Sequence, residues 1–219
     1  QHNTMNFKIT STSIGEIAYY INEVPNSTPI IFLHGVYYDH NLWNYYTSRI
    51  KDRTTITIDM PLHGNSKNIT KENWSIDDCS NMLIEILDAL EIEKCFAVGH
   101  SWGSMTILRA VNIQKERFEG VGLCNMPVEA GNSNKKLKFG FQHMMLGFRK
   151  FYTKQVANAM FSENNMIKKP ELAEYLDLSF NKLSDKEIRK TDKAVIMTVD
   201  DGEQYLDNLS PNTFIINGD

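Results

Sequence analysis

The chain has 219 residues, of which 42% are apolar and 23% charged, and its formal net charge is −4. This length suits one domain, or one domain that carries an inserted subdomain. A nucleic-acid partner would favour a basic face, so a mildly acidic chain gives no reason to expect one. No stretch is apolar over enough residues to cross a membrane, and we expect no membrane partner.

The three cysteines, Cys79, Cys95 and Cys124, are too few and too scattered for a disulfide framework. Cys95 and Cys124 fall within apolar runs, so we expect both to be buried and unreactive. Residues 1–4 have no apolar core of the kind found in signal peptides. These features together predict a cytoplasmic protein.

Strands and helices alternate in the first part of the chain. Short apolar or β-branched runs predict strands, and apolar residues at helical spacing predict helices. We expect strands at 14–21, 29–33, 54–58, 94–98 and 120–124, and helices at 42–50, 77–90 and 101–114. This alternation predicts an α/β fold, with a mostly parallel sheet flanked by helices on both faces.

The pattern changes after residue 127. No strand is apparent from 128 to 192, where helical patterns rich in Met and Phe prevail, and strand character returns at 213–216. A helical insertion between two strands of one sheet is the simplest interpretation. We therefore divide the chain into residues 1–127, the N-terminal part of the core; residues 128–193, a helical cap; and residues 194–219, a return to the core.

The segment Gly99-His100-Ser101-Trp102-Gly103 stands between a predicted strand and a predicted helix. In this context G-x-S-x-G is typical of a nucleophile elbow, a sharp turn whose flanking positions must be small. The turn raises the Ser101 hydroxyl above the sheet edge, where the helix dipole favours developing negative charge. The alternative is a chance match in an ordinary strand–helix connection.

His34-Gly35-Val36, here called the oxyanion loop, follows the buried strand at 29–33. Acyl transfer needs two backbone N–H donors directed at the developing oxyanion. The natural pair is Trp102 N–H, next to the nucleophile, and Val36 N–H, after the small Gly35. Taken alone, His-Gly could equally be a plain turn at the end of a strand.

Other histidines have non-catalytic interpretations. His63 lies in the breaker-rich loop at 59–66, where a loop-fixing hydrogen bond is the better explanation, and His100 is interpreted as a packed elbow residue. His143 lies among Met and Phe, on the surface of the cap or in a pocket lining. No His, Cys, Asp or Glu cluster has metal-ligand spacing and no Gly-rich phosphate loop is present, so we expect no metal and no cofactor.

These motifs resemble the α/β-hydrolase superfamily, in its capped serine-hydrolase branch of esterases and lactonases. The resemblance rests on His34-Gly35, on residues 59–66 (DMPLHGNS), on residues 98–104 (VGHSWGS), and on residues 214–219 (FIINGD), which look like the family's late strand and the start of its acid-bearing loop. It covers most of the chain. The dehalogenase and epoxide hydrolase branches carry Asp where Ser101 stands, so the resemblance argues against both.

The resemblance also implies an acid and a base that activate the serine. The family's acid follows the late strand, about three residues after its glycine, and the histidine comes later still. Here Gly218 is followed only by Asp219, and none of the six histidines is at that position. We therefore expect the acid and the base outside this chain, which we interpret as part of a longer protein. Asp219 and Glu129 are alternative acids, whereas Asn125, near a second family position, has no carboxylate.

The leading hypothesis is a serine hydrolase that cleaves a small carboxylic ester, lactone or thioester through an acyl-enzyme on Ser101. Alternatives are a non-catalytic small-molecule-binding receptor or scaffold with this fold, and an acyltransferase or perhydrolase that uses the same serine. We expect Tyr37, Trp102, Met144 and Phe148 to contact the substrate, which points to a small molecule with an apolar group. Ordinary helix packing explains each of the cap residues singly.

Overall fold

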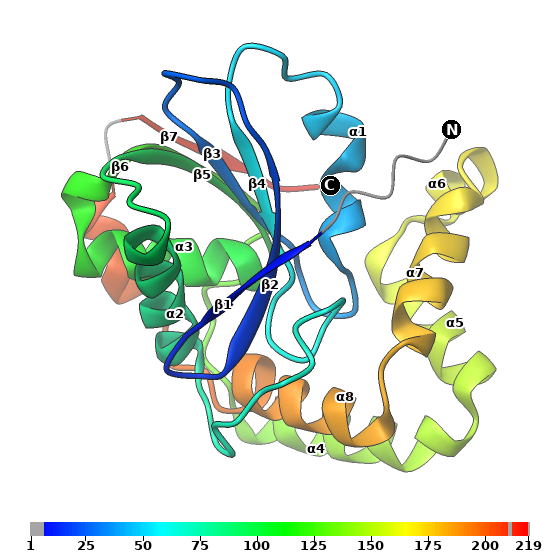
Figure 1. Cartoon of the computed structure of the whole chain (residues 1–219). Coiled ribbons are helices and arrows are strands. Elements are labelled where there is room, and N and C mark those ends of the chain that lie inside the picture. Colours follow the sequence, from blue (N-terminus) through cyan, green and yellow to red (C-terminus); the bar gives the residue numbers. More distant parts are fainter. Residues whose placement is uncertain (1–6, 210–211, 219) are drawn as a thin grey trace.

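The computed structural model describes residues 7–209 and 212–218. Its centre is a seven-stranded sheet in the order β1-β2-β4-β3-β5-β6-β7 (Figure 1). Strands β3 to β7 pair in parallel, whereas β1 with β2 and β2 with β4 pair antiparallel. The strands are β1 (Lys8–Ser11), β2 (Glu16–Asn22), β3 (Ile30–Leu33), β4 (Thr55–Ile58), β5 (Cys95–His100), β6 (Phe118–Cys124) and β7 (Thr213–Ile216). The predicted α/β fold with a mostly parallel sheet is confirmed.

Two long helices connect the central strands. Helix α2 (Ile76–Ala89) begins at a capping box between Ser75 and Asp78, which satisfies backbone N–H groups at its first turn. Helix α3 (Trp102–Ile113) packs beside α2 (Figure 1). Both bury an apolar stripe against the sheet. Because the connecting helices return the chain to the same sheet edge, the ends of β3 and β5 lie next to each other.

The segment expected to form a helix at 42–50 is shorter than predicted. It consists of a 3₁₀ turn, His40–Trp43, followed by the single-turn helix α1 (Asn44–Thr47). Trp43 is buried, but Tyr45 and Tyr46 are exposed. With so few buried side chains, little tertiary packing supports a longer helix.

Between β6 and β7 the described chain is helical, as expected for the cap. Its helices are α4 (Ser133–Met144), α5 (Arg149–Met160), α6 (Glu163–Lys168), α7 (Glu171–Asn181) and α8 (Asp185–Asp192), with a π-helical turn at Lys193–Met197 and a 3₁₀ helix at Glu203–Asn208. Figure 1 shows α4 and α8 at one end of the sheet and α5 to α7 at its side. The exact division at residues 128 and 193 stays a prediction, and we call residues 128–193 the cap.

Strand β7 lies at the edge of the sheet, next to β6. Its side chains Phe214, Ile215 and Ile216 are largely exposed. In the described part of the chain, this edge strand therefore presents apolar side chains to solvent. No helix in the described ranges, 7–209 and 212–218, has the length and apolar character to span a membrane.

Candidate active site

Ser101 lies at the turn from β5 into α3, with φ 51° and ψ −110°. Such a positive φ is uncommon for a residue with a side chain and marks local strain. The neighbouring glycines are required by space: a Cβ on Gly99 would overlap the Ser104 amide, and a Cβ on Gly103 would overlap the Leu33 carbonyl. This is the geometry that the G-x-S-x-G pattern predicts.

Hydrogen bonds to Cys124, at the end of β6, hold the nucleophile elbow in place. Ser101 N–H donates to the Cys124 carbonyl at 2.8 Å. The Ser104 hydroxyl donates to the same carbonyl at 3.1 Å and accepts the Cys124 N–H at 3.0 Å. In the described part of the chain the half-buried Ser101 hydroxyl has no hydrogen-bond partner. The backbone of the elbow is thus anchored while its hydroxyl stays available.

The oxyanion loop lies directly against the elbow. A Cβ on Gly35 would stand 2.6 Å from His100 Nδ1 and 3.2 Å from Ser101 Cβ, so only glycine allows this approach. His34 is completely buried, and burial lowers its pKa, which keeps the ring neutral. Met60 N–H donates to His34 Nε2 at 2.9 Å, so the proton resides on Nδ1, which donates to the Gly35 carbonyl at 2.7 Å.

This anchoring sets the direction of the Val36 amide. In a trans peptide the C=O and N–H point in opposite directions. With the Gly35 carbonyl held by His34, the Val36 N–H of the same peptide points to the other side. Neither Val36 N–H nor Trp102 N–H has an acceptor among the described residues. Trp102 is the first residue of α3, where a backbone N–H has no partner within the helix. Two unpaired amides therefore flank the elbow.

His63 supports the same region from the loop at 59–66. Its Nδ1–H donates to the Pro61 carbonyl at 3.0 Å, and its Nε2 accepts Tyr37 N–H at 3.1 Å. Burial lowers the pKa of His63 to about 3, so the ring is neutral at neutral pH. The interpretation of His63 as a loop-fixing residue is confirmed.

Asp59 organises the rest of that loop. Its buried carboxylate accepts both the backbone N–H of His40, at 2.8 Å, and His40 Nδ1, at 2.9 Å. It also accepts the Asn65 N–H at 2.8 Å. Burial opposes ionisation, but the hydrogen bonds and charge of His40 outweigh it and lower the pKa of Asp59. Gly64, at φ +49°, passes so close that any side chain there would overlap this carboxylate.

No histidine of the described residues hydrogen-bonds to the Ser101 hydroxyl. His34, His40 and His63 are engaged as above. The His143 Nε2 bonds to Asp192 in the cap at 2.7 Å. The half-buried His100 packs its ring on Tyr38 and has its Nε2 3.5 Å from Asn125 Nδ2, and burial lowers its pKa to about 4. The base expected for Ser101 therefore stays a prediction.

Among the described residues, neither Glu129 nor Asn125 orients a histidine toward Ser101. Glu129 is exposed and pairs with Lys135 at 3.4 Å. Asp219 lies outside the described residues. Asn125 joins β6 to β7: its N–H donates to the Ile216 carbonyl and its Oδ1 accepts the Gly218 N–H, both at 2.7 Å. Asn125 therefore supports the edge strand.

The expected substrate contacts need correction. The Trp102 ring is only 1% exposed and stacks on Trp74 at 5.6 Å, so it is a core side chain rather than a pocket wall. Tyr37 is 3% exposed, and its hydroxyl bonds to Asp192 instead of facing a ligand. Met144 and Phe148 are 74% and 67% exposed, so they do not enclose an apolar pocket in this structure.

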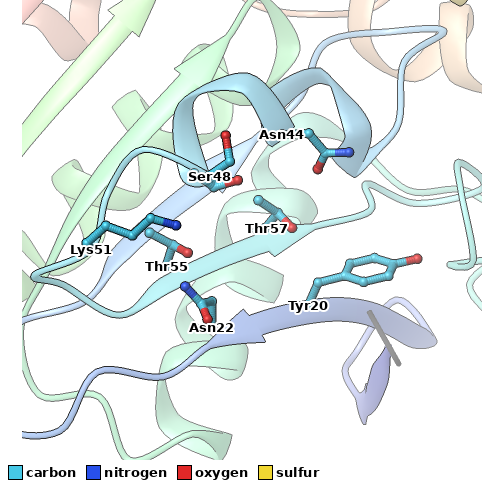
Figure 2. Close-up of a pocket in the computed structure, with 8 residues that line it drawn as sticks. Tyr20, Asn22, Asn44, Ser48, Lys51, Thr55 and Thr57 are labelled. Atoms are coloured by element: carbon cyan, nitrogen blue, oxygen red, sulfur yellow. The ribbon is translucent and has the colours of Figure 1, made fainter. Parts of the chain in front are cut away.

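A cavity of about 340 Å³ lies elsewhere, between α1 and strands β2 and β4 (Figure 2). Its lining residues are Tyr20, Asn22, Asn44, Thr47, Ser48, Lys51, Thr55 and Thr57. None of them belongs to the elbow or to the oxyanion loop. This cavity is therefore separate from the candidate active site.

The three cysteines differ in burial. Cys79 and Cys95 are buried as free thiols, whereas Cys124 is half-buried, which corrects the expectation of full burial. Burial raises the pKa of all three thiols, to about 12 for Cys95. Across the described residues, no group of three or more His, Cys, Asp or Glu side chains is placed to hold a metal ion.

Comparison with known proteins places this geometry in a family. The family model described as "alpha/beta hydrolase fold" matches residues 28–191, more than half of the chain. The chain is 30% identical to 3-oxoadipate enol-lactonase 1 of Acinetobacter baylyi over 118 residues. That match covers 53% of this chain and 44% of the lactonase, so the chain spans less than half the length of this relative.

Solved structures share the fold at low sequence identity. The enol-lactonase from Burkholderia xenovorans LB400 superposes with a TM-score of 0.76 at 15% identity, covering 97% of this chain and 91% of that one. A carboxylesterase structure from Nitrososphaera gargenis gives 0.77 at 16% identity, covering 96% and 80%. The elbow, the two unpaired amides, the sheet order and the family match agree. The chain belongs to the α/β-hydrolase fold family.

Proposed function

We propose that this protein is a serine hydrolase that cleaves a small carboxylic ester, lactone or thioester through an acyl-enzyme on Ser101. The observation that carries the proposal is the strained elbow, whose Ser101 hydroxyl and neighbouring Trp102 and Val36 amides have no hydrogen-bond partners among the described residues. The lactonase and carboxylesterase among its relatives support ester and lactone substrates. No step of this chemistry requires a metal or cofactor.

The reaction follows from these positions. Ser101 Oγ attacks the substrate carbonyl while a base removes its proton, and the carbonyl electrons move onto oxygen. Val36 N–H and Trp102 N–H donate to that oxyanion; loss of one such donor typically costs about 3 kcal/mol of transition-state stabilisation. The tetrahedral intermediate collapses, the leaving alkoxide takes the proton, and water then releases the acid from Ser101.

We further propose that the base is a histidine, oriented by an acid, and that both come from parts of the full-length protein outside the described residues. This placement fits the engagement of every described histidine in another interaction. The exposed cap side chains Met144 and Phe148 are proposed to meet an apolar group of the substrate. Three free cysteines support a cytoplasmic site of action.

The second candidate is a binding protein that uses this fold without catalysis. It is favoured by one observation, the lack of a base bonded to Ser101 within the described ranges.

An acyltransferase or perhydrolase would use the same Ser101 with an acceptor other than water, and product analysis would separate it from a hydrolase.

Turnover tests the proposal directly. The full-length protein should hydrolyse p-nitrophenyl acetate and open a simple lactone, and Ser101→Ala should abolish both. Ser48→Ala, which alters a serine far from the elbow, is the matched control and should keep full activity. A folded full-length protein that binds these compounds without cleaving them would support the binding protein instead.

A further inference from the structure

The segment after the oxyanion loop, residues 37–39, is one place where the cap contacts the core. The Tyr38 ring stacks on Tyr175 of α7 at 5.7 Å, and Asp39 accepts the Lys182 ammonium at 2.8 Å. The Tyr37 hydroxyl donates to Asp192, at the end of α8, at 2.6 Å. Three consecutive residues beside the oxyanion loop therefore bond to, or stack on, the cap.

We propose that Asp192, held by His143, is a positioning residue that fixes the oxyanion loop through Tyr37. The Val36 amide, whose direction is set by the His34 bond to the Gly35 carbonyl, is then held more firmly while Tyr37 is anchored to the cap. This inference rests on the proposed function, because it assigns the pair a role in the same Ser101 chemistry. In this proposal the cap stabilises the oxyanion loop, in addition to any cover it gives the substrate.

Tyr37 is built as a connector. Its backbone is at φ 67°, a strained region for an aromatic residue, so outside contacts must hold it there. Its N–H is held by His63 in the core, and its ring packs edge-on against Phe180 of α7 at 5.1 Å. Its hydroxyl reaches the cap carboxylate. One residue thus joins the core loop at 59–66 to the cap.

Asp192 is built as an anchor. It is completely buried, although a carboxylate without partners would be costly there. Two donors meet it: the Tyr37 hydroxyl on Oδ1 and His143 Nε2 on Oδ2, at 2.7 Å. His143 comes from α4, and its backbone carbonyl accepts Arg189 of α8 at 2.6 Å. The carboxylate therefore ties α4, α8 and Tyr37 to one point.

The link reaches Val36 through a single peptide. Val36 lies between Gly35, whose carbonyl is held by His34, and Tyr37, whose N–H is held by His63. If the Tyr37 side chain loses its anchor, the strained backbone at φ 67° can relax and turn the neighbouring peptides. The Val36 N–H would then point less well at the oxyanion, while the Trp102 amide, fixed in α3, would not move.

Such a loss should appear in kcat more than in KM, because an oxyanion donor acts mainly in the transition state. In the full-length protein with p-nitrophenyl acetate, Tyr37→Phe and Asp192→Ala should each lower kcat by about tenfold. Outright removal of an oxyanion donor typically lowers it by about 100- to 1,000-fold. KM should change by less than about twofold, since ground-state binding is largely retained.

Two controls separate positioning from general stability. Tyr20→Phe removes the same kind of group, a buried tyrosine hydroxyl that donates to a buried carboxylate, in this case Asp59 at 3.2 Å. It should lower the melting temperature without lowering kcat. Asp192→Asn keeps the shape, and its amide can accept from the Tyr37 hydroxyl and contact His143 Nε2, so it should restore most of the kcat that Asp192→Ala loses.

The amide hydrogen exchange of residue 37, whose N–H donates to His63 Nε2, provides a readout without turnover. Exchange at this amide should quicken in Tyr37→Phe and Asp192→Ala, but not in Tyr20→Phe or Asp192→Asn. The inference is wrong if folded Tyr37→Phe or Asp192→Ala keeps both the wild-type kcat and the wild-type exchange of the residue 37 amide. If Tyr37→Phe does not fold, equal kcat in Asp192→Ala and Asp192→Asn refutes it. A wild-type protein without turnover refutes the proposed function instead, and the exchange data still decide the positioning role.

Discussion

Gly35→Ala tests whether the approach of the oxyanion loop to the elbow sets the reaction rate. The added Cβ would stand 2.6 Å from His100 Nδ1, and contacts of this kind become ordinary only at 3.4 Å. Relief of this overlap needs a shift of about 0.8 Å between the two segments. The Cβ would also stand 3.2 Å from both the His100 carbonyl and Ser101 Cβ, so a rotation of the His100 ring alone does not remove the crowding.

A displacement of that size matters most for catalysis. Misplacement by about 1 Å lowers rates by about 100-fold, equivalent to about 2.7 kcal/mol in the barrier. We therefore expect kcat/KM for p-nitrophenyl acetate to fall by about 100-fold in the full-length protein. Overpacking should lower the free energy of unfolding by about 1–3 kcal/mol, measured by urea denaturation.

Gly140→Ala is the matched control, because nothing lies within 4 Å of a Cβ at this position in α4. Within a helix this substitution should stabilise the protein by about 0.5–1 kcal/mol and leave kcat/KM unchanged. If folded Gly35→Ala hydrolyses the ester within twofold of the wild-type rate, the oxyanion loop does not act at this distance and the reasoning fails.

Two further predictions concern the carboxylates that support the site. Asp59→Asn should lower the free energy of unfolding by about 3 kcal/mol in urea denaturation, because the buried carboxylate accepts N–H groups of His40 and Asn65 on its two oxygens and an amide has only one acceptor oxygen; a loss below 1 kcal/mol would contradict the scaffold role of Asp59. Burial raises the pKa of Asp39, but the hydrogen bond and charge of Lys182 outweigh this and hold it well below its ordinary value. The stabilisation from Asp39 should be complete above the unfolded-state pKa of about 3.9 and be lost as pH falls through the lower folded value. Melting temperatures between pH 2 and 6 should therefore drop less steeply for Asp39→Asn than for the wild type, and parallel curves would refute this assignment.

The elbow and the oxyanion loop could be predicted because their geometry is local. Gly99 and Gly103 leave room for backbone atoms a few residues away in the turn and on the adjacent strand β3. The G-x-S-x-G spacing in the sequence therefore indicates this close packing. His63 was likewise interpretable from its own loop. The alternation of strands and helices gave the sheet, although β1 was missed because its short run is mostly exposed and carries little apolar signal.

The contacts of Tyr37 and Trp102 could not be predicted in this way. Tyr37 bonds to a residue 155 positions away, and no local pattern indicates which cap residue will meet it. Because Trp102 follows the nucleophile, we expected its side chain to line the substrate pocket. Its ring instead stacks on Trp74 in the core. Both outcomes depend on how the cap and α3 pack in three dimensions.

The central claim is that Ser101 is the nucleophile, and covalent labelling tests it most directly. The full-length protein should react with a fluorophosphonate probe at one site, and mass spectrometry of the digested protein should place the label on Ser101. Ser101→Ala should remain unlabelled while its circular dichroism and melting temperature match those of the wild type. A folded wild-type protein that stays unlabelled, or a label that maps to another residue, would contradict the account.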